Sequence, residues 1–458
     1  MADPLDALSA EVRRNLRCFL LFRVFFNARF YYPVYTVLFL DHGLTMGQFA
    51  LLNAVWAASI VLLEVPSGAL ADQLGRKTLV VAAAILMVVE MVVLALAPVG
   101  GGWACLLLFL ANRIVSGAAE ASASGADEAL AYDCIPPSQR LQVWPRLMSR
   151  LMHWQAVAFI GVTIIGAWVY DPEMVNRLAA FAGLDLHVTR AAAVKFPILL
   201  NITTALLTLG IALRLQETPQ QRHTGPARAA LLASLRRTLT TGRWILRTPA
   251  PLLLILFGIT FDSFIRLFYT ISSNFYRLIE IPERHFGLIG AAGSLLALGA
   301  AWIVERLAHR TTASFQFFLV FLLAFAGLQG LAHPVRHYGV LLVVPLWIAM
   351  RFLHFFLSNH LNRVTGSSHR ATALSFRGLA MNASYGLIML LYGAQTLAVR
   401  AAQPGIDTGS LPVFAACLQW WPWAFLLASA SVWIFLRLRC RGKSLTQLVH
   451  DGAEAAGD

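Results

Sequence analysis

Apolar runs alternate with short polar or basic connections along nearly the whole chain of 458 residues. A helix that crosses a bilayer needs about 20 predominantly apolar residues, and twelve runs are long enough to serve. We expect helices at 19–40, 46–67, 78–98, 103–131, 147–170, 191–214, 250–275, 285–305, 313–332, 338–360, 374–398 and 412–436. The pattern therefore predicts an all-α polytopic membrane protein with twelve transmembrane helices.

The longest polar connection, 216–248, falls between the sixth and seventh predicted spans. It is rich in Arg, and 229–246 is expected to form a helix on the anionic membrane surface. We expect an N-terminal half over 1–215, a linker over 216–248, a C-terminal half over 249–440 and a cytoplasmic tail over 441–458. A weak internal repeat supports two halves, because 301–310 is a degraded copy of 68–77.

Composition and charge agree with a membrane protein. Only 13% of the residues are charged, against about 25% in soluble domains. With the N-terminus inside, 24 of the 36 Lys and Arg residues fall on the cytoplasmic side and 7 on the outer side. The net charge of +13 is therefore explained by the positive-inside rule rather than by nucleic-acid binding. The same count predicts that both termini lie in the cytoplasm. The basic residues are nearly all Arg, as in GC-rich bacterial genomes, so we expect a bacterial inner-membrane protein.

Residue types that build catalytic or metal sites are scattered along the chain. The five Cys residues form no CxxC pair and no metal-ligand spacing, and no nucleophile stands beside a base in a known arrangement. We therefore expect no metal, no cofactor and no enzymatic activity.

The most specific motif is the hairpin 68–77 between the second and third predicted spans. Gly68 is expected to let backbones approach closely, Asp72 to face a helix N-terminus and Gly75 to permit the sharp turn. The pattern Gly-x-x-x-Asp-x-x-Gly-Arg-Lys resembles the loop between helices two and three of the major facilitator superfamily. Gln73 stands where that family usually has a basic residue.

The resemblance implies two pseudo-symmetric six-helix halves that rock about a central site. It also implies a cytoplasmic latch, in which Asp127 lies near Arg76 and Asp72 opposes the start of the eleventh span at 371–375. The latch candidates are Glu64, Gly68, Asp72, Gly75, Arg76, Asp127 and Glu128.

In that family, helices one, four, seven and ten line the substrate cavity. A charge in hydrocarbon is costly unless it is paired or faces water, so polar residues on the corresponding spans are candidates for substrate binding. These cavity candidates are Asn27, Arg29, Tyr32, Arg113, Asp262, Arg266, Arg351 and His354. Because Arg outnumbers the carboxylates Glu120 and Asp262 here, the expected substrate is a small organic anion or zwitterion.

An alternative is that Asp262–Arg266 and Glu120–Arg113 are internal ion pairs that only fix helix packing. That alternative leaves Arg29 and Arg351 without obvious partners, although Glu90 or Glu64 could neutralise one of them. Both interpretations stay open on the sequence.

The stretch 113–117 resembles the family's fourth-helix motif, whose Arg is linked to proton coupling. A carboxylate beside an Arg in a partly dry cavity can bind and release a proton, so Glu120 and Asp262 are the proton-coupling candidates. A passive uniporter would need neither.

These observations favour a monomeric secondary active transporter whose partners are a small-molecule substrate, protons where transport is coupled, and the lipid bilayer. A multidrug or siderophore exporter is the first alternative, although the fifth span lacks the Gly-Pro pair of the family's antiporter signature. A non-transporting membrane sensor is the second.

Overall fold

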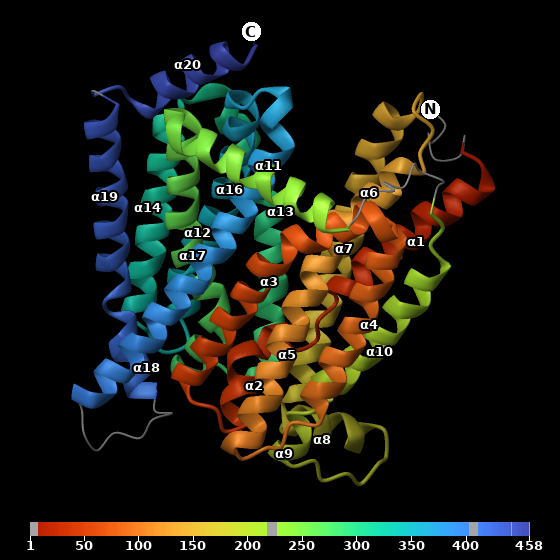
Figure 1. The fold of residues 1–458 in the computed structure, drawn as a ribbon. Coiled ribbons are helices and arrows are strands. Elements are labelled where there is room, and N and C mark those ends of the chain that lie inside the picture. The colour runs from red at the N-terminus through yellow and green to blue at the C-terminus, as the bar shows by residue number, and fades with distance from the viewer. Residues whose placement is uncertain (1–7, 218–226, 403–410, 441, 458) are drawn as a thin grey trace. The chain divides into compact units, whose positions relative to one another are not determined.

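The computed structural model describes residues 8–217, 227–402, 411–440 and 442–457, and within these ranges the regular elements are all helices (Figure 1). The chain forms two compact units. Unit 1 comprises Met1–Leu44, Ala58–Ser234 and Glu283–Ala291. Unit 2 comprises Thr45–Ala57, Leu235–Pro282 and Ala292–Asp458.

Most of the helices lie entirely within one unit or the other. Unit 1 contains α1 (Ala10–Asn27), η1 (Tyr32–Val34), α2 (Tyr35–Asp41), α4 (Arg76–Ala95), α5 (Gly102–Ala123), α6 (Ala126–Asp133), α7 (Arg140–Tyr170), α8 (Pro172–Phe181), α9 (Arg190–Ala193), α10 (Phe196–Arg214) and η2 (Glu283–His285). Unit 2 contains α12 (Pro249–Leu278), α14 (Ala313–Ala332), α15 (Gly339–Leu342), α16 (Val344–Val364), α17 (Ser367–Ala402), α18 (Leu411–Leu418), α19 (Trp421–Arg439) and α20 (Leu445–Gly457). Three helices contribute residues to both units, namely α3 (Met46–Leu74), α11 (Ala227–Arg247) and α13 (Phe286–Arg310).

Eleven membrane-length apolar helical segments occur among the described residues, and they correspond to the second to twelfth expected spans. The first expected helix, 19–40, is not continuous, because α1 ends at Asn27 and α2 begins at Tyr35. Pro33 lies in the gap; it has no backbone N–H and disfavours helical geometry in the residue before it. The backbone N–H of Phe30, freed by this break, donates to Asn201 Oδ1 at 2.7 Å.

At one end of unit 1, two glycines with positive φ separate consecutive helices. Gly75, at φ +98°, separates α3 from α4, as the hairpin motif predicted. Gly125, at φ +74°, separates α5 from α6 and so interrupts the span expected at 103–131. The second break positions the acidic residues of α6.

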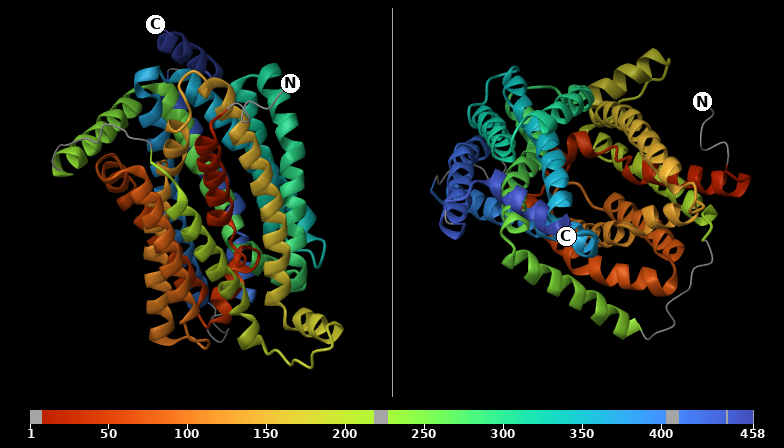
Figure 2. Two further views of the ribbon diagram at one scale, coloured as in Figure 1. Left: turned by 90° about the vertical axis from the view of Figure 1, so that its right-hand side faces the viewer. Right: turned by 90° about the horizontal axis from the view of Figure 1, so that it is seen from above.

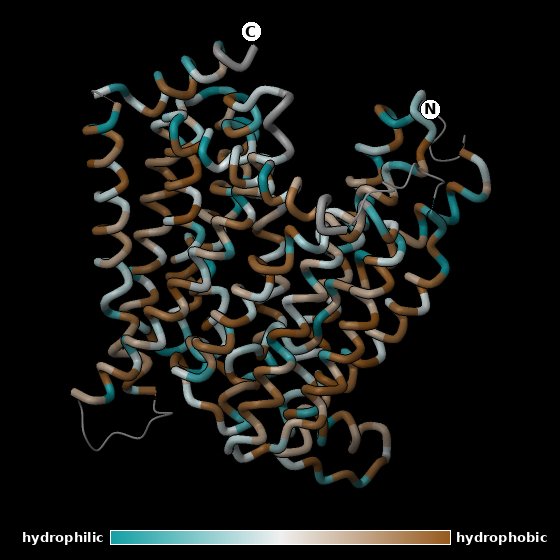
Figure 3. The backbone as a smooth tube through the Cα atoms, in the orientation of Figure 1, coloured by the Kyte–Doolittle hydropathy of each residue, from teal (hydrophilic) through white to brown (hydrophobic). Residues whose placement is uncertain are grey.

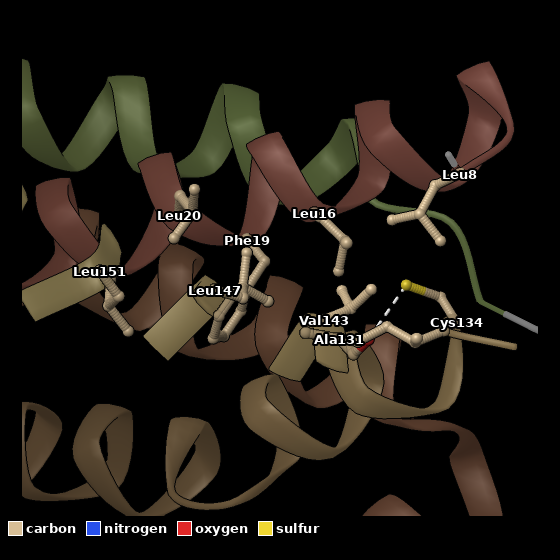
Figure 4. Packing of buried hydrophobic residues seen from close by; sticks show 10 residues of the cluster. Leu8, Leu16, Phe19, Leu20, Ala131, Cys134, Val143, Leu147 and Leu151 are labelled. Atoms are coloured by element: carbon tan, nitrogen blue, oxygen red, sulfur yellow. Dashed lines mark hydrogen bonds between the residues drawn. The ribbon is translucent and has the colours of Figure 1, made fainter. Parts of the chain in front are cut away.

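A buried apolar cluster holds α1 against α7 (Figure 4). Each helix contributes side chains three or four residues apart, which places them on one face. These residues are Leu16, Phe19 and Leu20 from α1 and Val143, Leu147 and Leu151 from α7. The cluster anchors the part of α1 that carries Arg23.

Hydrophobic residues dominate the long helices, and hydrophilic ones concentrate near helix ends (Figure 3). The linker helix expected at 229–246 is present as α11. The tail, in contrast, contains a helix that the sequence pattern did not indicate: α20 lies across the ends of α14 and α16 (Figures 1 and 2). Thr446 and Ser314 exchange hydrogen bonds of 3.1 Å there.

Candidate functional site

The most buried apolar span, α12, carries a polar cluster in unit 2. Of its most apolar 18 residues, 72% are buried, and Asp262 is fully enclosed. One carboxylate oxygen of Asp262, Oδ2, lies 2.6 Å from Nη2 of Arg266, one turn further along α12. The other oxygen, Oδ1, lies 3.1 Å from Nε2 of His354 on α16. The buried Asp262 carboxylate is therefore compensated by an ion pair with Arg266 and by its contact with His354.

Polar residues of α17 extend this cluster. Arg266 Nη1 donates to Asn382 Oδ1 at 3.0 Å, and its guanidinium lies 5.3 Å from the centre of the Tyr385 ring. Tyr385 Oη lies 2.9 Å from the hydroxyl of Thr270. Asn382 and Tyr385 were not expected as site residues, although polar side chains inside a predicted span could have indicated them.

Arg351 stands one turn before His354 on α16 and is exposed. No ion pair to Arg351 is present among the residues that the structure describes. Arg266 pairs with the Asp262 carboxylate, and Arg377 of α17 also interacts with it electrostatically. Arg351 adds a further guanidinium one turn from His354, which has 47% of its side chain exposed and can add a charge when protonated. Unit 2 thus presents a surplus of positive charge beside an exposed face.

Unit 1 carries a second polar cluster near the break between α1 and α2. Arg29 forms an ion pair with Glu90 of α4, and their side chains are 2% and 0% exposed. The Asn112 side chain donates to the backbone carbonyl of Glu90 at 2.7 Å. Glu90, one of the two carboxylates considered for Arg29, therefore neutralises it within the fold.

Arg113 of α5 is held by neutral groups. Its guanidinium donates to Asn112 Oδ1 at 2.6 and 2.9 Å and to Tyr35 Oη at 2.8 Å. The ion pair considered between Arg113 and Glu120 is not among those that the described residues form. The remaining cavity candidates of this unit are more accessible: Tyr32 is 42% exposed, and the exposed Asn27 donates to the Arg23 backbone carbonyl.

The acidic residues of α6 pair differently from the expected latch. Asp127 accepts a hydrogen bond from Arg23 of α1 at 3.0 Å, and Glu128 accepts one from the same guanidinium at 3.1 Å. Arg76 instead pairs with Asp133 and donates to the Ala129 carbonyl at 3.1 Å. The expectation that Asp127 lies against Arg76 was therefore wrong. The break at Gly125 restarts the helix, so Asp127 falls in its first turn and Asp133 at its end.

The N-terminus of α4 also has an unexpected partner. Glu217, which follows α10, accepts a hydrogen bond from the Arg76 backbone N–H at 2.7 Å. A carboxylate at a helix N-terminus is favourable, and this is the position expected for Asp72. The side chains of Asp72 and of 367–371 lie outside the described residues, so the expected pairing of Asp72 with 371–375 stays a prediction.

Gly68 and Glu64 complete the latch candidates. Among the described residues, no atom beyond its own stretch of helix lies within 4 Å of a Cβ placed at Gly68, so the expected close backbone approach there was wrong. The link between α3 and α5 is made nearby by Ser67, whose hydroxyl donates to the Ala121 carbonyl at 2.7 Å. Glu64 lies on the same stretch, and its backbone carbonyl accepts a hydrogen bond from the Ser67 hydroxyl at 2.9 Å.

The opposite end of unit 1 carries a second ion-pair network. Arg190 lies 2.6 Å from Asp41 and 3.0 Å from Glu283. Arg284 lies 2.5 Å from Glu173, and its guanidinium lowers the pKa of that exposed carboxyl. The sequence pattern did not indicate this network, because these residues stand in short connections far apart in the chain.

Long apolar helices that enclose buried ion pairs define a multi-pass membrane protein. A family model described as Major Facilitator Superfamily matches residues 17–389. The chain belongs to this superfamily, as the hairpin motif predicted.

Solved structures show the same fold. The chain is similar to a bacterial homologue of the human lysosomal transporter Spinster, with 14% identity, a TM-score of 0.69 and coverage of 97% of this chain and 99% of that one. It is similar to the nucleoside transporter NupG at 11% identity, TM-score 0.67 and coverage of 93% and 99%. It is also similar to a D-xylose-proton symporter at 13% identity, TM-score 0.62 and coverage of 91% and 96%. No curated protein sequence matches this chain. The predicted fold, twelve helices in two six-helix halves, is confirmed.

Proposed function

We propose that the protein is a secondary active transporter that moves a small organic anion or zwitterion by alternating access. The observation that carries this proposal is Arg351, an exposed cation inside a membrane span beside the Asp262–Arg266–His354 cluster. An unpaired charge in such a position is costly unless it faces water or a counter-ion. A substrate carboxylate or phosphate supplies that counter-ion and matches the planar guanidinium fork.

Proton coupling is assigned to Asp262 and His354. The carboxylate is buried, and its imidazole partner is half exposed, so water or substrate reaches the pair from the His354 side. An anion bound at Arg351 would lie one helical turn from His354, so the charges of the substrate and of a proton on this pair would interact. Glu120 is the second candidate proton carrier, since it is half-buried on α5 two turns beyond Arg113.

The ion pairs around α6 act in this proposal as the latch that biases the conformational equilibrium. They comprise Arg23 with Asp127 and Glu128, and Arg76 with Asp133. Asp127 is buried, and its Arg23 partner and the Arg76–Asp133 pair are partly exposed. Exposed ion pairs contribute about 0–1 kcal/mol each, and a bias of this size shifts two states of similar energy without locking either. Since most Lys and Arg residues fall on this side of the spans, we place it, and both termini, at the cytoplasmic face of a bacterial inner membrane.

The substrate class is tested by thermal stabilisation of the purified protein with panels of organic anions, zwitterions, cations and lipophilic drugs. A ligand at 100 times its Kd stabilises the folded state by about 2.7 kcal/mol. We expect shifts with anions or zwitterions that disappear in Arg351→Gln and persist in Arg363→Gln, a matched control at the exposed end of the same helix. Shifts confined to lipophilic drugs would support an exporter instead.

Coupling is tested separately, in proteoliposomes with an imposed pH gradient. Substrate accumulation should follow the gradient in the wild type and become independent of it in Asp262→Asn, while exchange of substrate across the membrane persists. If Asp262→Asn still concentrates substrate and Glu120→Gln does not, the proton carrier is Glu120. An absence of both uptake and ligand-induced stabilisation in the wild type would favour the non-transporting sensor.

A further inference from the structure

An apolar groove of about 630 Å³ runs along unit 2 between α12, α14, α19 and the start of α20. Its walls are mostly apolar and rich in aromatic side chains, of which Phe318 and Trp433 are 56% and 51% exposed. Such a volume falls within the range of ligand sites, about 300–1,000 Å³. None of Asp262, Arg266 and His354 lines the groove.

The groove ends at a basic rim. Arg437 lines it, with its guanidinium 4.6 Å from the centre of the Trp433 ring. Lys443 stands at the same end but pairs with Asp451 at 2.9 Å. No carboxylate pairs with Arg437 among the residues that the structure describes. An apolar groove with one cation at its end that no carboxylate pairs with is complementary to an amphiphile that has a negatively charged headgroup.

The membrane setting decides which amphiphile is recognised. Lipid tails are as apolar as the groove walls, so a neutral lipid gains little by leaving the bilayer for it. The cation at the rim is the feature that can distinguish one lipid from another, because each Arg or Lys near the surface attracts anionic lipid by about 1 kcal/mol.

We infer that this groove binds one anionic glycerophospholipid, with an acyl chain along α14 and α19 and the phosphate at Arg437. The interfacial Trp433 beside that guanidinium suits the boundary between tail and headgroup. Leu445, the first residue of α20, and Ser444 just before it close the end of the groove.

The headgroup contact is tested by native mass spectrometry of the full-length protein titrated with phosphatidylglycerol or with phosphatidylcholine of the same acyl chains. The wild type should retain one phosphatidylglycerol with a preference of roughly fivefold over phosphatidylcholine. Arg437→Gln should abolish the preference, and Arg439→Gln, an exposed Arg outside the groove on the same helix end, should keep it. Equal retention of both lipids by the wild type, or an unchanged preference in Arg437→Gln, would overturn the inference.

The acyl-chain contact is tested by filling the groove. Ala430 lines it, and Ala430→Phe should remove the retained lipid, whereas Ala424→Phe, exposed elsewhere on α19, should not. If Ala430→Phe lowers the melting temperature of the lipid-free protein, the smaller Ala430→Leu replaces it. Retention of one phosphatidylglycerol in a folded groove-filled variant would place the lipid elsewhere and refute the assignment.

Discussion

The Arg29–Glu90 ion pair allows a quantitative test of how unit 1 is stabilised. Glu90→Gln leaves the Arg29 guanidinium, whose side chain is 2% exposed, beside a neutral amide. Removing one partner of a buried ion pair costs about 3–5 kcal/mol, because the other charge stays buried without compensation. The hydrogen bond from Asn112 survives, since it goes to the Glu90 backbone carbonyl.

The expected loss converts to a measurable shift. At about 2–4 °C per kcal/mol for a unit of this size, Glu90→Gln should lower the melting temperature by roughly 6–20 °C. The double variant Arg29→Met with Glu90→Leu removes both charges and should recover most of the loss, because apolar replacement of a buried pair is often neutral. Melting is compared at one scan rate in one detergent, since membrane proteins often unfold irreversibly.

A matched control separates burial from the change of residue. Glu173→Gln makes the same substitution in the exposed pair with Arg284 and should shift melting far less. If Glu90→Gln melts within 1–2 °C of the wild type, or if the double variant is as unstable as the single one, the pair does not carry the stability assigned to it.

Three further predictions concern other parts of the chain. Gly75→Ala should destabilise the protein by about 1–3 kcal/mol in thermal unfolding, because φ is +98° and the new methyl group would meet the Glu217 carboxylate; a neutral result would mean that the hairpin relaxes freely. The stability that the Arg284 contact gives to Glu173 is present above the unfolded pKa and is lost as pH falls through the lower folded pKa, so the melting difference between wild type and Glu173→Gln should begin to shrink at about pH 4 and vanish only below the folded pKa. Asp72→Asn should slow transport more than it weakens substrate binding, and equal turnover in proteoliposomes would rule out a latch role.

The sequence predicts the helices and the family well because both depend on local signals. An apolar run of about twenty residues is sufficient to predict a span. The turn between α3 and α4 is determined locally, because Gly75 adopts the positive φ that the turn requires. The break between α1 and α2 was missed because Pro33 is a single weak signal inside an apolar run. The helix α20 was missed because its docking rests on Ser314 and other residues distant in the chain.

Pairing partners are harder to predict than elements. Asp127 and Asp133 both stand near the end of the same predicted span, and the choice between them for Arg76 depends on the restart of the helix at Gly125. Glu217 could not be assigned to the N-terminus of α4 from the sequence, because it lies 141 residues from Arg76 and matches no motif.

The arginines of the cavity candidates separate into two kinds once their partners are known. Arg29 and Arg266 each have a buried carboxylate, and Arg113 is held by Asn112 and Tyr35. A count of charges along the spans treats these three side chains and Arg351 alike. It therefore overstates the number of Arg side chains that are available to bind a substrate. Substitution of Arg29 should therefore reduce stability before it reduces affinity, whereas substitution of Arg351 should reduce affinity in a protein that still melts normally. Measuring both quantities on both variants separates a structural arginine from a binding one, and loss of anion binding in a stable Arg29→Met, Glu90→Leu protein would contradict this division.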